Sequence, residues 1–296
     1  MQGPAAGTLV ARVLAAVRRN EAVGPDAVTL LAREYAAEGS EAAGEAVGVA
    51  VARVLAAVSD DPPWAPSPTE GRSDSASERA AWLALLVDIA GMSDDSRLHP
   101  AISALCDRTV EGWPSRARLA TAMREVTAAL RAAPVVRPAL VAKVVDELER
   151  LVGCTYQPGR GLLARPGERE HGTAADHIQA AIALLTAHAV TGRLPYAMLA
   201  DELIQFASRS WWGGDLRHAV TLEEVAERSE AARVLAHLAV VHAEPRYMET
   251  AVVTAGYDHV AEAGRLLAAA EPSPHGIHAC VYALAVEEIT RLKREE

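Results

Sequence analysis

Apolar residues recur at intervals of three and four positions along nearly the whole chain. One such stripe consists of Leu119, Met123, Val126 and Leu130. This spacing places apolar side chains on one face of an α-helix, whereas a half-buried strand needs strict alternation. Proline and glycine stand between the stripes, where helices begin and end. The pattern predicts an all-α fold of about twelve or thirteen helices and no strand.

A short motif occurs twice in the C-terminal half of the chain. Residues 190–196 read VTGRLPY, and residues 241–247 read VHAEPRY. In each copy an alanine-rich helical pattern ends, a turn follows, and Tyr196 or Tyr247 opens the next helical pattern. Repeats of this kind are typical of helical hairpins stacked in series. We therefore expect stacked antiparallel hairpins, arranged either as an open solenoid or as a closed ring.

Two segments lack this periodicity. Residues 60–77 are rich in Pro, Ser, Gly and Asp, so they are predicted to be a linker or long loop. This predicted linker would separate N-terminal hairpins in 1–59 from a main helical-hairpin domain in 78–296, unless the two parts form one continuous fold. Residues 153–172 contain five glycines, and we expect a second irregular segment that is mobile or depends on a ligand for its order.

Charge and composition narrow the classes of partner. The net charge is −10, and no cluster of Lys and Arg exceeds the spacing of an ordinary helix surface. We therefore expect no binding to nucleic acid or to anionic membranes. Residues 1–5 lack the basic and apolar pattern of a secretory leader, so we expect none; no stretch is long and apolar enough to span a membrane, and the three cysteines are widely separated. These features predict a soluble cytoplasmic protein whose partner is a small molecule or another protein.

Four residues are candidates for acid–base chemistry. Asp176 and His177 open a predicted helix after the glycine-rich segment, where an acid, a base or a bound anion is plausible. The alternative is that Asp176 caps this helix together with Thr173. Glu230 and His237 lie on one face of a later helix, about 10 Å apart along its axis, so they would flank a ligand. The alternative is that both reach water at the edge of the apolar stripe.

A second group of residues is predicted to bind a ligand. The helices over 173–192 and 196–210 are expected to run antiparallel, so the loop before the first and the turn after the second lie at the same end. This end gathers aromatic and polar side chains of the kind that line small-molecule sites. The candidates are Tyr156, Arg160, Trp211, Trp212, Asp215 and His218. The alternative is that the two Trp side chains only fill a gap between layers of helices.

No metal or other cofactor is predicted from the sequence motifs. His275, His278 and Cys280 lie close together, but their spacing matches no standard zinc motif. The chain also contains no phosphate-binding glycine loop and no nucleophile motif of the G-x-S-x-G type.

The hairpin motif resembles that of a known group of helical proteins. Thr191-Gly192, Tyr196, Ala200 and the Trp-Trp-Gly-Gly-Asp run at 211–215, echoed at Tyr247, resemble hairpins of (α/α) toroid proteins, which include six-hairpin glycosidases and the N-acylglucosamine 2-epimerase group. The similarity covers residues 173–270. It implies a ring of hairpins around a cavity in which acid–base chemistry acts on a sugar or another small metabolite. The catalytic residues of that group do not map onto this chain one by one.

Two functions are therefore left open by the sequence. The first is a helical-repeat binding or scaffold protein that recognises a small molecule or a protein partner, and the absence of a catalytic motif favours it. The second is a toroid enzyme that uses Asp176, His177, Glu230 or His237. Convergence of these side chains on one cavity would favour the enzyme.

Overall fold

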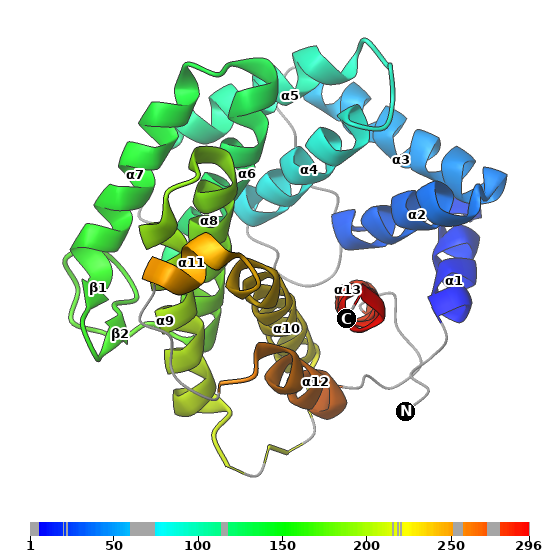
Figure 1. The fold of residues 1–296 in the computed structure, drawn as a ribbon. Coiled ribbons are helices and arrows are strands. Elements are labelled where there is room, and N and C mark those ends of the chain that lie inside the picture. Colours follow the sequence, from blue (N-terminus) through cyan, green and yellow to red (C-terminus); the bar gives the residue numbers. More distant parts are fainter. Residues whose placement is uncertain are drawn as a thin grey trace. The chain divides into compact units, whose positions relative to one another are not determined.

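The computed structural model describes residues 6–19, 21, 23–59, 75–113, 118–214, 216–217, 219, 221–250, 257–270 and 279–295. These residues form thirteen α-helices and one small two-stranded β-hairpin (Figure 1). The predicted all-α fold is confirmed. Among the described residues, no helix combines the length and apolar character that a membrane crossing requires.

The chain divides into two compact units. The first contains residues 1–117 and 124–147, and the second contains 118–123 and 148–296. Two helices, α6 (Leu119–Val136) and α7 (Leu140–Thr155), therefore contribute to both. Residues 60–74 lie outside the described part of the chain, so the predicted linker and the division between 1–59 and 78–296 stay predictions.

Five helices belong wholly to the first unit: α1 (Ala6–Arg18), α2 (Pro25–Glu38), α3 (Glu41–Ser59), α4 (Ser75–Ala90) and α5 (Leu98–Glu111). Helix α2 packs against α3, and α4 packs against α5. The predicted apolar stripes supply the core, as Val54, Val58 and Ile89 are all buried. The predicted linker extends slightly too far, because α4 already begins at Ser75 and carries the acidic Glu78 in its first turn.

The remaining helices form the second unit: α8 (Ala174–Thr191), α9 (Leu194–Trp211), α10 (Leu222–His242), α11 (Pro245–Thr250), α12 (His259–Ala270) and α13 (Cys280–Glu295). Helices α8 and α9 form the first hairpin of the repeat. Helix α10 contacts α8, α9, α11, α12 and α13, so it is the central helix of this unit. Both repeat hairpins begin with a capping box, formed by Thr173 with Asp176 and by Thr221 with Glu224.

Residues 153–172 are ordered, contrary to the expectation of an irregular segment. Helix α7 continues to Thr155, and β1 (Tyr156–Gln157) then pairs antiparallel with β2 (Gly161–Leu162). A further bridge joins Leu163 to His171. Strand β2 contacts α8 and α9, and Leu162 is fully buried. The expectation fails because strands of two residues are too short to show a periodic pattern.

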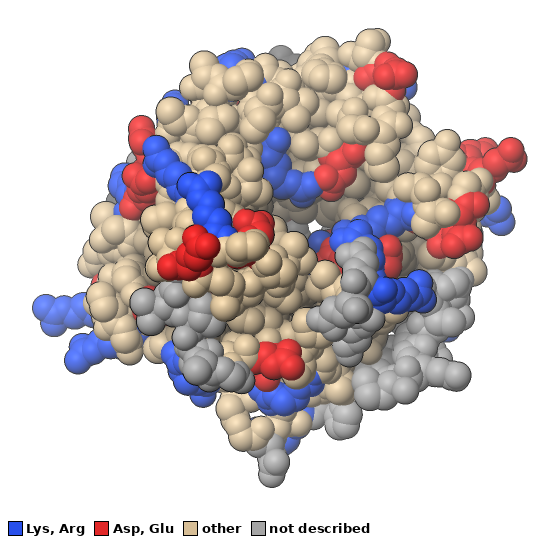
Figure 2. Space-filling view, in the orientation of Figure 1, with Lys and Arg blue, Asp and Glu red and all other residues tan. Residues whose placement is uncertain are grey.

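Charges of both signs share the surface. On the face shown in Figure 2, the acidic and basic side chains of the described residues lie interspersed among uncharged ones. Several of the described charges are paired, for example Arg137, just after α6, with Asp107 of α5 at 2.8 Å, and Arg233 of α10 with Glu288 of α13 at 2.9 Å.

Candidate metal centre

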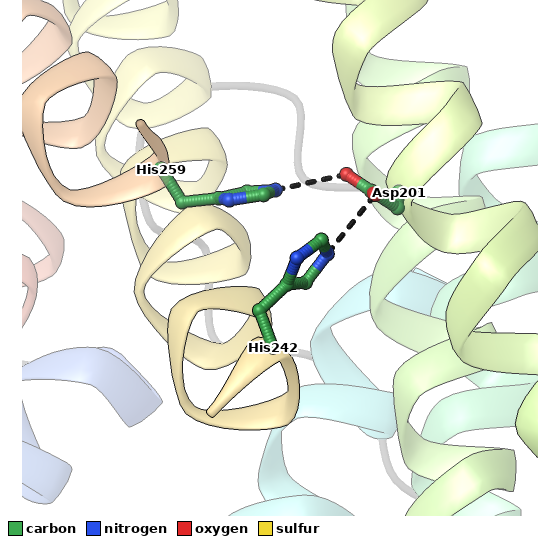
Figure 3. A group of neighbouring side chains, drawn as sticks. All are labelled: Asp201, His242 and His259. Carbon is green, nitrogen blue, oxygen red and sulfur yellow. Dashed lines mark hydrogen bonds and ion pairs between the residues drawn. The ribbon is translucent and has the colours of Figure 1, made fainter. Parts of the chain in front are cut away.

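Three side chains from three helices meet in the second unit: Asp201, His242 and His259 (Figure 3). Asp201 lies on α9, His242 is the last residue of α10, and His259 is the first residue of α12. The Nε2 atom of His242 lies 3.1 Å from Oδ2 of Asp201, and Nε2 of His259 lies 2.9 Å from Oδ1. Each carboxylate oxygen therefore faces one imidazole.

The cluster is buried and held by its neighbours. The side chains of His259, Asp201 and His242 are 5%, 9% and 12% exposed. One helical turn beyond Asp201, the Gln205 amide donates a hydrogen bond to Oδ1 of Asp201 at 2.9 Å. Tyr247 packs on the ring of His242, with ring centroids 4.7 Å apart. The Asp201 carboxylate is therefore held in place by the Gln205 amide and the two imidazoles.

A second tyrosine covers the other imidazole. Tyr257 stands edge-on to His259, with the ring centroids 4.9 Å apart. Burial raises the pKa of Tyr257 and of Tyr247 to about 12. Both phenols are therefore neutral at physiological pH and add no charge to the cluster.

The surroundings also set the charge of the cluster itself. Burial alone would raise the pKa of the Asp201 carboxyl, but hydrogen bonds from His259 and Gln205 outweigh burial, and the pKa is lowered. Burial lowers the pKa of His242, and the nearby His259 lowers it further. At neutral pH, Asp201 is therefore ionised and His242 neutral. These are the protonation states in which a carboxylate and an imidazole bind a metal ion.

The geometry suits a single metal ion. One ligand atom from each of Asp201, His242 and His259 lies within 4.8 Å of the other two. Ligand atoms bound to one Zn²⁺ at about 2.0–2.2 Å lie about 3–4 Å from one another. Side-chain rotations that move the ligand atoms by about 1 Å would therefore allow all three to bind the ion. The bound form requires each Nε2 to lose its hydrogen, which a neutral imidazole achieves by carrying its proton on Nδ1.

Asp176 and His177, predicted from sequence as an acid–base pair, hold backbone groups in the structure. Asp176 accepts hydrogen bonds from the backbone N–H groups of Thr173 and Ala120, each at 2.8 Å. His177 is fully buried, and burial lowers its pKa. Its Nε2 accepts the N–H of Leu162 at 2.9 Å, and its Nδ1 donates to the carbonyl of Thr173 at 2.8 Å. The two side chains thereby join β2 and α6 to the start of α8.

The other two acid–base candidates lie on α10. Glu230 accepts a hydrogen bond from the Gln179 amide of α8 at 2.6 Å, so it ties two helices together. The side chain of His237 is exposed. Neither residue belongs to the cluster of three ligand atoms around Asp201.

The predicted ligand-binding end of the α8–α9 hairpin is brought together in space. The Trp211 ring lies 5.1 Å from the His177 ring and 6.0 Å from the Phe206 ring, and Trp211 is 41% exposed. Trp212 is buried, in keeping with a side chain that fills a gap.

The β-hairpin contributes the polar members of the same end. The Tyr156 hydroxyl donates to Glu202 of α9 at 2.6 Å, and Arg160 is exposed in the turn between β1 and β2. Burial, followed by this bond to Glu202, raises the pKa of Tyr156 to about 12. The two remaining candidates, Asp215 and His218, lie outside the described residues.

The sequence patterns did not point to Asp201, His242 and His259 as a site. The two histidines follow Asp201 at separations of 41 and 58 residues, so no local spacing connects them. One signal was present: Asp201, Gln205 and Ser208 occupy positions i, i+4 and i+7 of α9, and all three are buried. Polar residues on the buried face of a helix call for partners, which here come from α10 and α12.

No protein-family model matches this chain, and no curated protein is similar to it in sequence. The resemblance of its hairpins to (α/α) toroid proteins therefore stays a proposal.

Proposed function

We propose that this protein binds one divalent transition-metal ion, Zn²⁺ in the first instance, through Asp201, His242 and His259. One observation carries the proposal: a buried carboxylate, one buried imidazole and one largely buried imidazole, from three helices, converge to within 4.8 Å. Imidazole nitrogen with carboxylate oxygen is a donor set that suits Zn²⁺, Fe²⁺, Co²⁺ or Ni²⁺. Mg²⁺ and Ca²⁺ prefer sites made of oxygen alone.

The alternative is a purely structural network of hydrogen bonds. Taking a carboxylate and two imidazoles out of water is costly, and apolar residues of similar volume often serve stability equally well. If a metal ion binds, the same carboxylate and imidazoles become its ligands, and the bonds to the metal offset the cost of removing them from water. Three protein ligands also leave a coordination position open, which is typical of zinc sites that act on a bound molecule.

This site refines the two functions inferred from the sequence. We propose a helical-hairpin protein that binds a small molecule at its metal ion. The second candidate function, a toroid-type enzyme acting on a small metabolite, would use the same open position of the metal. Cys106 and Cys154 are free cysteines, which supports a cytoplasmic location, where thiols stay reduced.

Metal binding is tested on the full chain after removal of metals by a chelator. Equilibrium dialysis with Zn²⁺ should give one ion per chain, and Co²⁺ should give visible absorption bands of a low-symmetry site. Asp201→Asn, His242→Gln and His259→Gln should each weaken Zn²⁺ binding by at least about tenfold. The matched control is His237→Gln, which removes an exposed histidine from the same helix as His242 and should leave binding unchanged.

Two results would contradict the proposal. The first is wild-type protein that takes up no Zn²⁺, and the second is a set of variants that bind it as well as the wild type does. Far-UV circular dichroism of each metal-free variant separates loss of a ligand from loss of the fold. His242→Gln is the most informative variant, because His242 ends its helix and is the most exposed of the three ligands.

A second binding surface is favoured by the position of Trp211, which is exposed beside the β1–β2 hairpin. We propose that this end of the α8–α9 hairpin contacts a small-molecule or protein partner. Trp211→Ala should then abolish ligand-induced thermal shifts in a metabolite screen, with the fold retained. Unfolding of this variant would instead identify Trp211 as part of the core.

A further inference from the structure

We infer that the metal ion at Asp201, His242 and His259 takes a small monovalent anion, of the carboxylate or azide type, as its exogenous ligand. This inference rests on the proposed metal site and names the chemical class of the molecule that the site binds. It follows from the number of protein ligands, the net charge of the loaded site and the neighbours that surround it.

The protein supplies three ligands. Within the described residues, the cluster of candidate ligand atoms consists of Asp201, His242 and His259. Gln205 is the next polar group, but its amide nitrogen donates to the Asp201 carboxylate. A Zn²⁺ or Co²⁺ ion in tetrahedral coordination therefore keeps one position for a molecule from solution.

The loaded site has a positive net charge. A divalent ion with one carboxylate and two neutral imidazoles carries a charge of about +1. The acidic residue one turn along α12, Glu262, does not neutralise it, because Arg265 binds its carboxylate at 2.7 and 2.8 Å. Glu262 and Arg265 together add no net charge near the ion.

Because the site is largely buried, its net positive charge favours an anion over water as the fourth ligand. The three ligand side chains are only 5–12% exposed, so water screens the site weakly. A buried charge without a partner is costly, and an anion in the fourth position cancels it where a water molecule does not. A single residual charge matches a monovalent anion better than a dianion such as hydrogen phosphate.

The neighbours limit the size of the ligand. Tyr247 packs against the His242 ring and Tyr257 against the His259 ring, so each imidazole has an aromatic neighbour. His242 is the most exposed ligand, and exposed residues Ala243 and Glu244 follow it in the turn before α11. We therefore expect a ligand of only a few atoms, approaching from the end of α10, where His242 is the most exposed of the three ligands. The exchange is simple: the anion forms a bond to the metal, and the bound water leaves.

The test uses the full chain loaded with Co²⁺, whose visible spectrum reports on coordination. Sodium azide and then sodium acetate are titrated, with sodium perchlorate as the control for ionic strength. We expect azide to shift the Co²⁺ bands in a saturable manner with one azide per ion, acetate to compete with azide, and perchlorate to have no effect.

A charge variant tests the electrostatic argument. Arg265→Gln removes the positive partner of Glu262, one turn along α12 from His259, while the hydrogen bond from Ser208 stays. The uncompensated negative charge should weaken azide binding several-fold, with the Co²⁺ stoichiometry unchanged. The matched control is Arg193→Gln, which breaks the exposed pair of Arg193 with Glu149 and should leave azide binding unchanged. Because Arg265 also donates to the Trp212 carbonyl, circular dichroism verifies the fold of the variant.

The possible failures are distinguishable. Absence of Co²⁺ uptake would refute the metal site itself. Normal Co²⁺ uptake with a spectrum that neither azide nor acetate changes would leave the metal site standing and overturn the inference, because the fourth position would then be closed. Azide binding that acetate does not compete with would overturn the assignment of carboxylates to this class.

Discussion

Replacing Gly161 by alanine should destabilise the second unit by about 2–5 kcal/mol. Gly161 opens β2 with a φ of 78°, a left-handed conformation that costs other residues about 1–2 kcal/mol. An added Cβ would lie 2.3 Å from Nε2 of His177 and 2.6 Å from Cε1 of Phe206. Because Nε2 of His177 accepts a buried hydrogen bond, the ring cannot move without loss, and such overpacking typically costs about 1–3 kcal/mol.

Gly159→Ala provides the matched control in the same hairpin. Gly159 also has a positive φ, 71°, but an added Cβ there meets no atom within 4 Å. The control should therefore lose only the conformational cost of about 1–2 kcal/mol. The difference between the two variants, about 1–3 kcal/mol, isolates the packing of β2 against α8 and α9.

The assay is urea unfolding followed by far-UV circular dichroism and tryptophan fluorescence. The urea concentrations at the midpoints of unfolding are compared between variants that have the same m-value, the slope of the unfolding free energy against urea concentration. An altered m-value would indicate a change in the folded or unfolded state other than stability alone. Equal losses for Gly161→Ala and Gly159→Ala would refute the close approach of β2 to His177 and Phe206. The ordered hairpin described for residues 153–172 would then be wrong as well.

Two further predictions concern buried groups of the second unit. Burial lowers the pKa of His177 below the 6.5 of the unfolded chain. Below about pH 6.5 the unfolded state therefore binds more protons than the folded state. The free energy of unfolding should decrease as the pH is lowered, by up to about 1.4 kcal/mol per pH unit. In metal-free protein, His177→Gln should flatten this dependence between pH 7.5 and 5, and an unchanged slope would show that His177 is not the group. Arg228 is buried and donates to the carbonyls of Arg217 and Ala269 at 2.7 and 2.8 Å, so Arg228→Met should cost about 1–3 kcal/mol in urea unfolding, whereas the exposed Arg160→Met should cost nearly nothing.

The helices were predictable because their signal is local. Burial of one face requires apolar residues three and four positions apart, and the predicted stripe of Leu119, Met123, Val126 and Leu130 is fully buried. The capping box at Thr221 also depends on neighbouring residues alone. The β-hairpin was not predictable because its strands are only two residues long, and because the approach of Gly161 to His177 and Phe206 is a tertiary contact that leaves no local pattern.

The metal centre was not predictable from such local patterns. Asp201, His242 and His259 belong to three helices, and each taken alone is a common residue of a helix end or surface. Asp176 and His177, by contrast, are adjacent in sequence and attractive as an acid–base pair. Asp176 accepts the N–H of Thr173, because the start of a helix leaves N–H groups that need acceptors. His177 donates to the Thr173 carbonyl and accepts the N–H of Leu162 in β2. Polar residues that are adjacent in sequence at a helix start thus serve the local backbone, whereas the candidate site is formed by residues that only the packing of helices brings together.

The two copies of the repeat use the same turn in different ways. In the first copy, Arg193 and Tyr196 both contact Glu149 of α7, at 3.4 and 2.5 Å, and the side chains of Arg193 and Glu149 are 62% and 52% exposed. An exposed pair of this kind contributes at most about 1 kcal/mol and needs no further explanation.

In the second copy, the turn brings His242 to Asp201 of α9, where both side chains are nearly buried. Tyr247, the counterpart of Tyr196, packs on the His242 ring instead of binding the carboxylate. A carboxylate buried with two imidazoles is costly to desolvate and gives little stability that apolar residues could not provide. Stability alone therefore does not account for this turn. The proposed ion would account for it, because metal binding would offset the cost of desolvation, and one carboxylate with two imidazoles fits a transition metal.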